Sequence, residues 1–574
     1  MIHYRKGEFT NSMDEKINKK WNQWKNHYLA DADLMNELDS IKQNESEIID
    51  RFYRELEFGT GGLRGVIGAG TNRMNIYTVA KATQGYSNYL KKQTDYPSVA
   101  IAYDSRIKSD VFAKKAAEVF AANGIHVYIY PELMPTPSLS FAVRYLKCAG
   151  GIVITASHNP SKYNGYKVYG SDGCQITTEA ASSILSEIEN LDIFNDINSI
   201  SFEEAQLNGR ISYIEEVVVT AYLDAVTGQT LSGEEINKGV SIVYTPLNGS
   251  GLKCVTRVLK ENGFTNISVV PEQENPDGNF PTCPYPNPEM KEALDLGLRE
   301  AKKLGSDLLL ATDPDCDRVG IAVLNKGEYV LLSGNEVGML LLDYICKRRI
   351  AIGKMPQNPV LVKTIVTIDM ANKIANDYGV KVIDVLTGFK FIGEQIGRLE
   401  ANGLEESFIL GFEESYGYLT GGYVRDKDAV VGSLMICEMF AYYKTHGLSL
   451  VDVLERLYEK YGYCLNTLHS YTFEGSKGFQ KMQEIMLYLR KDSIKSIGSK
   501  TITVVKDYQN GINGLPKSDV LKFLLEGGDS VVIRPSGTEP KIKVYLSLNA
   551  DSIDEAKKLE SYMVSELEEI FKLN

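Results

Sequence analysis

The chain has 574 residues, of which 43% are hydrophobic and 24% charged, and its formal net charge is −13. At roughly 150 residues per domain, this length predicts about four domains with several hydrophobic cores. The acidic balance argues against a nucleic-acid surface, which would need concentrated Lys and Arg.

Membrane insertion and secretion are also not expected. No apolar run reaches the ~18 residues that span a bilayer. The first residues, MIHYRKGEFTNSMDEK, lack the apolar core of a secretory signal. The eight cysteines include no CxxC pair, so we expect reduced thiols in a cytoplasmic protein.

The first predicted elements are helices, followed by alternating strands and helices. Residues 1–48 are polar and charged and predict a helical N-terminal extension, with Trp21 and Trp24 as packing anchors. From about residue 50, short apolar runs alternate with longer helical patterns, which is typical of βαβ units and a mostly parallel sheet. The first such runs are strands at 98–104, 125–131 and 150–156, and helices at 111–124 and 138–148.

The strand–helix pattern then restarts twice. Strands are predicted at 239–251, 263–271 and 306–313, and again at 358–367, 380–388 and 406–415. The last hundred residues differ, with strand-like runs at 501–508, 529–537 and 541–548 before a helix at 552–572. The fold class is therefore α/β with four domains: three tandem α/β sheet domains and a smaller α+β C-terminal domain, around a central cleft. The predicted boundaries are 1–48 for the extension, then 49–208, 209–338, 339–465 and 466–574.

Polar loops follow several of the predicted strands. Because ligands in doubly wound sheets bind outside the carboxyl ends of the strands, these loops predict one composite site. The loops are TASHNP (155–160), TDPDCDR (312–318), TGFKF (387–391), GFEESYG (411–417) and RPSGTEP (534–540).

The acidic loop predicts a metal site. Asp313, Asp315 and Asp317 alternate along it, and three close carboxylates repel each other unless a cation neutralises them. Hard oxygen ligands suit Mg²⁺ or Ca²⁺. An EF-hand is excluded, because loop position 6 is Arg318 and not Gly, and position 12 is Leu324 and not Glu. A solvated acidic turn is the alternative.

Ser157 allows two interpretations. It is not in a GxSxG nucleophile elbow, and its neighbour His158 is poorly placed to act as its base. A serine before Asn-Pro is usually a turn or cap residue. It could instead carry a phosphoryl group if a metal and cations, such as Lys162 and Lys167, neutralise the charge.

The C-terminal loop predicts phosphate binding. Arginine's fork, hydroxyls and free N–H groups match a phosphate, although an exposed basic hairpin would look the same. The residues that could bind a phosphate in this loop are Arg534, Ser536, Gly537, Thr538 and Lys541.

Two further loops are less distinctive. Glu413 and Ser415 alternate and could both face one ligand such as a sugar, or lie in a polar turn. FGTGGLRG (58–65) departs from GxGxxG because Arg64 stands where the third glycine should be. It could deliver Arg64 to a phosphate or be a plain flexible turn.

Together, these loops in this order resemble those of the α-D-phosphohexomutase superfamily. The matching elements are FGTGGLRG, TASHNPxxYNGxK, DPDxDR, the GEES-like loop and RPSGTEP, so the resemblance covers nearly the whole chain after about residue 45. The TGFKFIGE and GFEESYG versions are similar to the phosphoglucomutase branch.

The resemblance implies a role for each motif. Ser157 would be the phosphoserine and would bind one Mg²⁺ with Asp313, Asp315 and Asp317. Lys167 and Lys390 would be acid/base candidates, Arg64 and Arg318 would lie near the transferring phosphoryl group, and His158 would have a supporting role. Domain I would carry the phosphoserine loop, domain II the metal loop, domain III the sugar loops and domain IV the phosphate loop. The sugar would face Gly388, Phe389, Lys390, Glu413 and Ser415, and the non-reacting phosphate would bind Arg534, Ser536, Gly537 and Thr538.

The implied reaction interconverts glucose 1-phosphate and glucose 6-phosphate through glucose 1,6-bisphosphate, which would act as activator and intermediate. The only partner expected is this small-molecule sugar phosphate, and the sequence leaves the oligomeric state open. Positive groups and a metal would lower the pKa of Lys167 toward that of a base. Phosphomannomutase, phosphopentomutase, a sugar 1,6-bisphosphate synthase and a non-catalytic sugar-phosphate sensor remain alternatives.

Overall fold

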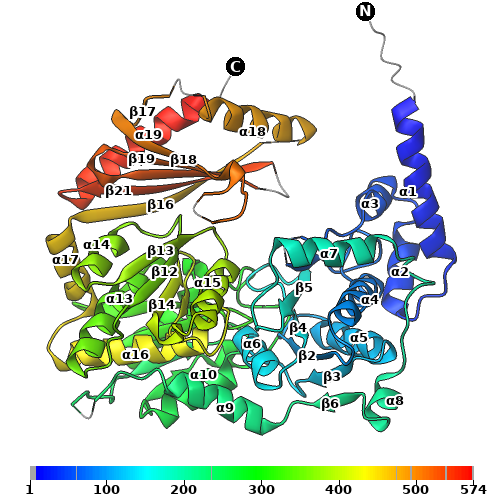
Figure 1. Ribbon diagram of the computed structural model, residues 1–574, viewed down its shortest axis with the longest axis horizontal. Coiled ribbons are helices and arrows are strands. Elements are labelled where there is room, and N and C mark those ends of the chain that lie inside the picture. Colours follow the sequence, from blue (N-terminus) through cyan, green and yellow to red (C-terminus); the bar gives the residue numbers. More distant parts are fainter. Residues whose placement is uncertain are drawn as a thin grey trace, which may run out of the picture. The chain divides into compact units, whose positions relative to one another are not determined.

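The protein divides into two compact units in the computed structural model (Figure 1). The model describes residues 8–59, 61–233, 235–473, 475–491, 494–512, 514–536 and 540–571. The first unit takes in the chain up to Thr230, with Gly239–Leu324 and Gly422–Leu434. The second takes in Leu231–Lys238, Asn325–Gly421 and the chain from Met435 onward. None of the described helices is both long and apolar enough for a membrane span.

The first sheet confirms the predicted alternation of strands and helices. Its strand order is β1-β5-β4-β2-β3-β6, and β2 pairs in parallel with both β3 and β4. The strands are β1 (Gly62–Val66), β2 (Ser98–Tyr103), β3 (His126–Ile129), β4 (Gly150–Ile154), β5 (Tyr163–Gly170) and β6 (Ile211–Tyr213). The helices are α4 (Ile76–Gln93), α5 (Ser109–Ala122), α6 (Thr136–Tyr145), α7 (Thr178–Glu189), α8 (Phe202–Leu207) and α9 (Glu216–Thr227).

This sheet also contains a segment expected as a loop and a segment that the predicted strands did not include. β1 contains GLRG of the glycine-rich motif, and β5 contains YNGYK; β5 runs antiparallel to both β1 and β4. Gly165 shows why the pattern concealed β5: a Cβ there would lie 2.4 Å from the carbonyl oxygen of Thr155 and 2.9 Å from that of Leu63. Glycine is needed for this close backbone approach, and it removes the apolar signal of a strand.

A second sheet completes the βα layers of the first unit. Its described order within this unit is β10-β9-β7-β8, with β7 parallel to β8 and β9, and β10 antiparallel to β9. The elements are β7 (Ile242–Thr245), α10 (Leu252–Glu261), β8 (Ile267–Val269), α11 (Pro271–Glu274), α12 (Lys291–Leu304), β9 (Leu308–Thr312) and β10 (Val319–Asn325).

The second unit begins with the third predicted α/β set. β12 is central, with β13 and β14 parallel to it and β15 antiparallel to β14. A capping box of Ser333 and Glu336 starts α13, as a Ser-x-x-Glu sequence favours. The elements are β11 (Glu328–Leu332), α13 (Gly334–Ala351), β12 (Val360–Thr364), α14 (Met370–Asp377), β13 (Lys381–Val385), α15 (Phe389–Ala401), β14 (Phe408–Glu413), β15 (Gly417–Leu419), α16 (Ala429–Thr445) and α17 (Leu450–Tyr461).

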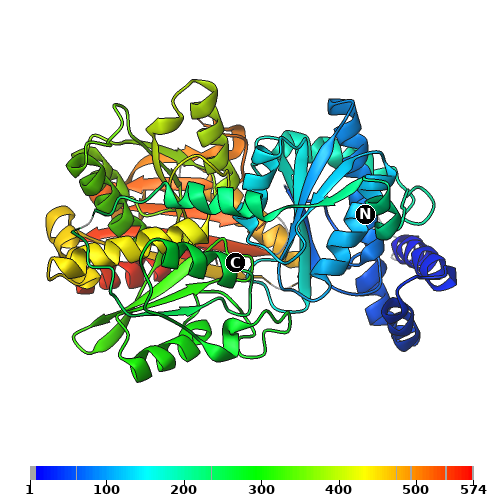
Figure 2. The same cartoon turned by 90° about the horizontal axis from the view of Figure 1, so that it is seen from below.

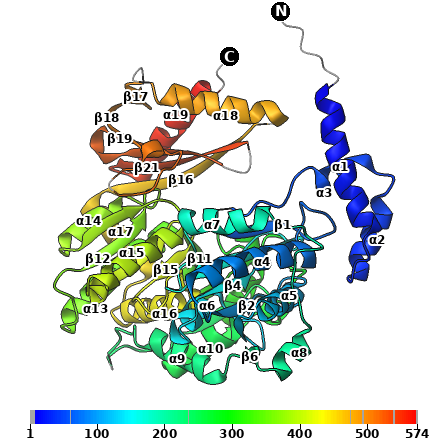
Figure 3. The ribbon, with the colours of Figure 1, turned by 45° about the vertical axis from the view of Figure 1, so that its right-hand side comes forward.

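The C-terminal part is α+β, as predicted, and consists of an antiparallel sheet with two helices on one face, α18 in addition to the predicted last helix (Figure 3). Its order is β16-β21-β20-β19-β18-β17. Buried side chains such as Leu521, Val544 and Met563 form its core between sheet and helices. The elements are β16 (Tyr463–Thr472), α18 (Gly475–Leu489), β17 (Ser496–Ile497), β18 (Lys500–Asp507), β19 (Leu521–Leu525), β20 (Ser530–Pro535), β21 (Lys541–Ala550) and α19 (Ile553–Phe571).

Sheet membership differs from two of the predicted boundaries. β6 belongs to the first sheet although the boundary was placed at 208/209, and β16 belongs to the last sheet although it begins before 465/466. Both strands follow a helix closely and carry polar residues, so no local pattern indicates which sheet they join. The domain boundaries themselves stay predictions.

The N-terminal extension is helical, as predicted, and lies outside the layers of the first sheet (Figure 2). It consists of α1 (Glu8–Asn26), α2 (Ala32–Ile41) and α3 (Glu45–Phe52). Trp24 is fully buried, and its ring centroid lies 5.9 Å from that of Phe52, 5.6 Å from Tyr77 and 5.4 Å from Phe194. Trp21 also packs on Phe52, so both tryptophans are the anchors that the sequence suggested.

Replacing Trp24 with Ala should detach the extension. The lost packing of a buried tryptophan costs about 3–5 kcal/mol. Hydrogen exchange of the α1–α3 amides should therefore accelerate in Trp24→Ala. Tyr28→Ala, at a side chain that is 83% exposed, is the control and should leave exchange unchanged. Equal protection in both variants would contradict the anchoring role.

Candidate functional site

Ser157 lies in the loop after β4 and faces the acidic loop. Its Oγ donates a hydrogen bond to Asp313 Oδ2 at 2.9 Å, and its N–H donates to Thr155 Oγ1 at 2.8 Å. Its φ of 52° is left-handed, which is uncommon for a non-glycine residue. No helix follows in residues 158–162, so the helix-cap interpretation is wrong.

The three aspartates form a buried carboxylate cluster between β9 and β10. Asp313, Asp315 and Asp317 are fully buried, and carboxylate oxygens from all three lie within 4.8 Å of one another. One oxygen each of Asp315 and Asp317 has no hydrogen-bond partner. Burial raises the pKa of Asp313 well above its usual range, and the charges of Asp317 and Asp315 raise it further. Such unsatisfied oxygen ligands fit a hard divalent cation, whose charge would relieve the repulsion.

Two lysines border this cluster. Lys167, on β5, places Nζ 2.8 Å from Asp315 and 3.5 Å from Asp317, and Lys427 lies 2.6 Å from Asp317. Burial would raise the pKa of Asp315, but Lys167 and Lys427 outweigh it and hold that pKa well below its usual range.

The prediction that the pKa of Lys167 is lowered is wrong: the protein groups around Lys167 raise it. Burial does lower the pKa of Lys167, but the carboxylates of Asp315 and Asp317 outweigh burial and raise it. The sequence argument counted the positive neighbours and not the two carboxylates in direct contact. Lys167 therefore holds its proton.

Arg64, Arg318 and His158 are near the serine as well. Arg64 lies on β1 and donates to Asn159 Oδ1 at 3.4 Å. His158 Nδ1 lies 3.2 Å from Ser157 Oγ, so adjacency in sequence does not prevent contact. Burial, together with the charges of Arg318 and Arg64, lowers the pKa of His158 to about 2. The imidazole is therefore neutral at ordinary pH.

Lys427 is a site residue that the sequence analysis missed. It belongs to YVRDKDA (423–429), a charged stretch far along the chain from the acidic loop. Neighbouring contacts fix this stretch in the first unit: Tyr169 OH donates to Asp426 at 2.6 Å, and Tyr222 OH donates to Asp428 at 2.9 Å. The available signal was a Lys among acidic residues before an apolar helix, which is also typical of a solvated loop.

In the second unit, Gly388 and Glu413 lie together. Gly388, with a φ of 117°, precedes α15 and donates its N–H to Glu413 Oε1 at 3.0 Å. Phe389 is buried in the first turn of α15, where Lys390 follows it. β14 ends at Glu413, so Ser415 lies in the β14–β15 turn and the two do not alternate along one strand.

The phosphate loop is described only in part. Arg534 is half-buried on β20, and Ser536 donates its N–H to the Lys541 carbonyl at 2.7 Å. Gly537 and Thr538 lie outside the described residues.

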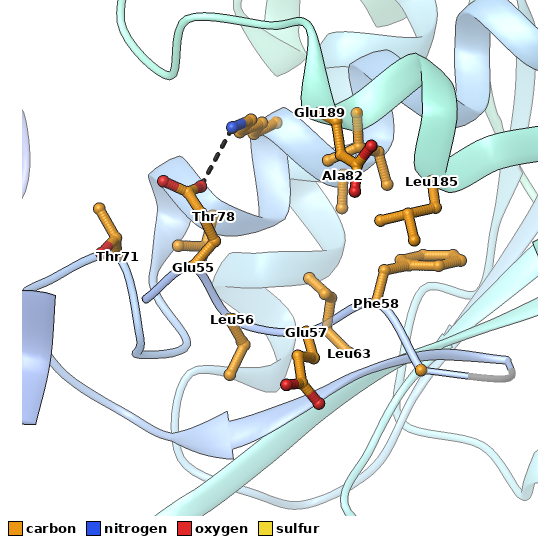
Figure 4. A pocket seen from close by; sticks show the side chains of 13 residues that line it. Glu55, Leu56, Glu57, Phe58, Leu63, Thr71, Thr78, Ala82, Leu185 and Glu189 are labelled. Atoms are coloured by element: carbon orange, nitrogen blue, oxygen red, sulfur yellow. Dashed lines mark hydrogen bonds and ion pairs between the residues drawn. The ribbon is translucent and has the colours of Figure 1, made fainter. Parts of the chain in front are cut away.

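A cavity of about 470 Å³ lies beside the segment that leads into β1 (Figure 4). Phe58 and Leu63 line it together with Leu185 of α7, and the Glu55–Lys81 ion pair of 3.1 Å lies at its border. Its lining includes Phe58, Gly59 and Leu63 of the glycine-rich motif but none of the predicted catalytic or metal-binding residues. This cavity is therefore separate from the serine and the aspartates.

Comparison with known proteins shows the family of the chain. Models of the phosphoglucomutase/phosphomannomutase α/β/α domains I, II and III match residues 55–193, 220–327 and 333–461, and the C-terminal domain model matches 492–564. The chain belongs to this family of α-D-phosphohexomutases, as the motifs predicted. It is an isomerase, an intramolecular phosphotransferase.

Individual relatives agree over most of the chain. Phosphoglucomutase of Staphylococcus haemolyticus is 36% identical over 519 residues, covering 88% of this chain and 93% of that protein. Phosphoglucomutase of Staphylococcus aureus N315 is 37% identical over 541 residues, covering 91% and 95%. Among solved structures, a phosphoglucomutase/phosphomannomutase family protein of Burkholderia thailandensis shares the fold with a TM-score of 0.65, at 18% identity and coverage of 89% and 97%. The phosphoglucomutase parafusin of Paramecium does so with a TM-score of 0.64, at 17% identity and coverage of 91% and 95%.

The neutral state of His158 has a measurable consequence. A histidine exposed to solvent titrates near pH 6.5. His158 in the metal-free, dephosphorylated protein should instead show no NMR titration between about pH 8 and about pH 5. The unfolded chain binds a proton below about pH 6.5 that folded His158 does not bind until about pH 2. This residue should therefore make stability fall as the pH falls through that window. His158→Gln assigns the resonance, and a midpoint near 6.5 would contradict the burial argument.

Proposed function

We propose that the protein interconverts α-D-glucose 1-phosphate and glucose 6-phosphate through a phosphoserine at Ser157. The observation that carries this proposal is the 2.9 Å hydrogen bond from Ser157 Oγ to Asp313 inside a fully buried carboxylate cluster. The phosphoglucomutases named above support glucose as the sugar. Glucose 1,6-bisphosphate would form when Ser157 gives up its phosphoryl group, and its other phosphate would return to Ser157 after the sugar turns round.

One Mg²⁺ would be held by Ser157, Asp313, Asp315 and Asp317. All the donors are hard oxygens, and two carboxylate oxygens lack hydrogen bonds, so the residues fit this ion. When bound, Mg²⁺ supplies charge neutralisation at the phosphoryl group.

The chain's own residues provide the remaining charge and the proton transfers. Arg64 and Arg318 would stabilise the transferring phosphoryl oxygens, since phosphoryl transfer depends mainly on positioning and electrostatics. Lys167 holds its proton because Asp315 and Asp317 raise its pKa, so it can donate to Ser157 Oγ as the phosphoryl group leaves. Lys390 would be the second acid/base candidate, and neutral His158 has a supporting role.

The second unit would bind the rest of the substrate. Glu413 and Ser415 would hold sugar hydroxyls beside Gly388, Phe389 and Lys390. The non-reacting phosphate would be gripped by Arg534, Ser536, Gly537 and Thr538. Binding energy at this remote phosphate can orient whichever hydroxyl reacts.

We further propose a cytoplasmic enzyme whose partner is the small sugar phosphate. Each of the eight cysteines, all of them in described parts of the chain, is buried with a free thiol, as expected for a reducing compartment.

Turnover of glucose 1-phosphate tests the function. With Mg²⁺ and a trace of glucose 1,6-bisphosphate, the protein should form glucose 6-phosphate faster than it converts mannose 1-phosphate or ribose 1-phosphate. Ser157→Ala should lose at least about 10⁴-fold in kcat, the size of effect seen when a catalytic nucleophile is removed. Ser161→Ala, in the same loop, should retain activity. Substantial turnover by Ser157→Ala would exclude the phosphoserine, and a preference for another sugar ester would exclude glucose.

Asp313→Asn should separate metal binding from folding. Asn can keep its oxygen on the N–H groups of Asp317 and Arg318 and donate its amide to Ser157 Oγ, while it removes one carboxylate from the cluster. The metal-free variant should therefore be as stable as the wild type or more stable. Mg²⁺ at about 100 times its Kd should stabilise the wild type by about 2.7 kcal/mol and this variant hardly at all, read by thermal unfolding. Asp295→Asn, at an exposed position on α12, is the matched control. Equal stabilisation of Asp313→Asn would exclude this site.

A further inference from the structure

The side chain of Arg106 is buried beneath the serine loop. It lies three residues after the end of β2, and its side chain has no solvent exposure. β2 and β4 are parallel neighbours, with Tyr103 opposite Ile154, so Arg106 emerges at the same sheet edge as Ser157. Its guanidinium donates to backbone carbonyl oxygens of the loop. These belong to Ser157, Asn159, Pro160 (3.0 Å) and Tyr163 (3.1 Å).

The carboxylate of Asp104 connects Arg106, through Thr155, to the backbone N–H of Ser157. Asp104 Oδ2 lies 3.3 Å from Arg106 Nε and accepts from Thr155 Oγ1 at 2.6 Å. Thr155 Oγ1 in turn accepts the N–H of Ser157 at 2.8 Å. The backbone N–H and C=O of Ser157 are therefore both held, one through Thr155 and Asp104 and the other by Arg106.

These contacts on both peptide groups of Ser157 stabilise a disfavoured backbone conformation. Ser157 has a φ of 52°, a left-handed conformation that is disfavoured for residues other than glycine. Such conformations persist where surrounding contacts over-determine them, and they concentrate at functional sites. Fixing both peptide groups of Ser157 sets the direction in which its Oγ points.

A loop of the second sheet domain seals Arg106 from solvent. The ring centroid of Phe280 lies 5.1 Å from the guanidinium carbon, and Phe280 is 1% exposed. The same loop contacts the backbone next to Arg106, because a Cβ on Gly278 would lie 2.4 Å from the Ile107 nitrogen. Arg106 is thus enclosed by protein on this side, and the described hydrogen bonds of its guanidinium go to backbone carbonyls of the serine loop and of Tyr163 at the start of β5.

We propose that Arg106 is a positioning residue for phosphoryl transfer. It keeps the strained Ser157 in the one orientation that aims its Oγ at the carboxylate cluster. The inference rests on the proposed function, because it takes Ser157 as the phosphoryl carrier. Arg106 acts through Ser157 and not on the substrate, so its loss should lower kcat and leave KM nearly unchanged. A small misplacement of a reacting atom is enough to lower the rate ~10²-fold.

Arg106→Lys is the direct test. Lysine keeps the positive charge but lacks the planar guanidinium fork that binds four carbonyl oxygens at once. In full-length enzyme, kcat should fall about 100-fold with KM within about twofold. The ³¹P resonance of phosphoserine 157 should shift or broaden in the variant, which a purely stabilising residue would not cause. Arg257→Lys, at a partly exposed arginine paired with Glu216 and Glu261, is the control and should behave as wild type.

Asp104→Asn keeps the test decisive if Arg106→Lys does not fold. It preserves shape and removes the carboxylate that orients Arg106 and Thr155, so kcat should fall about tenfold with unchanged KM. A kcat within threefold of wild type in the folded variants, with an unshifted ³¹P line, would overturn the positioning role. Different outcomes would contradict the proposed function itself. These are a wild-type enzyme that carries no phosphate at Ser157, or turnover by Ser157→Ala.

Discussion

The repulsion among three buried carboxylates is the constraint on which the site depends. Asp313, Asp315 and Asp317 lie where water cannot screen them, so the surrounding chain must supply positive charge or donors. Lys167 and Lys427 come from a strand and a loop some 260 residues apart in sequence and meet the same cluster. The hydroxyl of Ser157 provides the donor to Asp313. The serine proposed to carry the phosphoryl group is thereby held beside the carboxylates proposed to bind the cation, an arrangement that suits phosphoryl transfer.

The fold class could be predicted, and candidate site residues could be named, because strand-end loops follow a simple geometric rule. Apolar runs such as those of β4 and β9 are unambiguous strands, and the polar residues after them must gather at one sheet edge. Ser157 and the aspartates were found in this way, and the described structure joins them by a hydrogen bond. Glu413 was named from its loop and Gly388 from the family resemblance, and the two are in contact.

The remaining residues were missed for physical reasons. β5 carries glycine where a backbone approaches closely, so it lacks the apolar alternation of a strand. Lys427 is brought to the cluster by tertiary contacts of Asp426 and Asp428, which no local pattern encodes. Arg106 sits at a strand end that the rule does cover, but a single arginine after a strand is usually solvated. The pKa of Lys167 required distances to two carboxylates, and a sequence does not contain them.

The return of residues 422–434 to the first unit has a consequence for how the protein is made. Asp317 leaves the ribosome more than a hundred residues before Lys427, and the whole third sheet is synthesised between them. At typical translation rates the delay is on the order of ten seconds. During that interval the nascent acidic loop has Lys167 but not its second lysine. The first unit therefore cannot complete the charge balance of its carboxylate cluster until residues 422–434 have been synthesised.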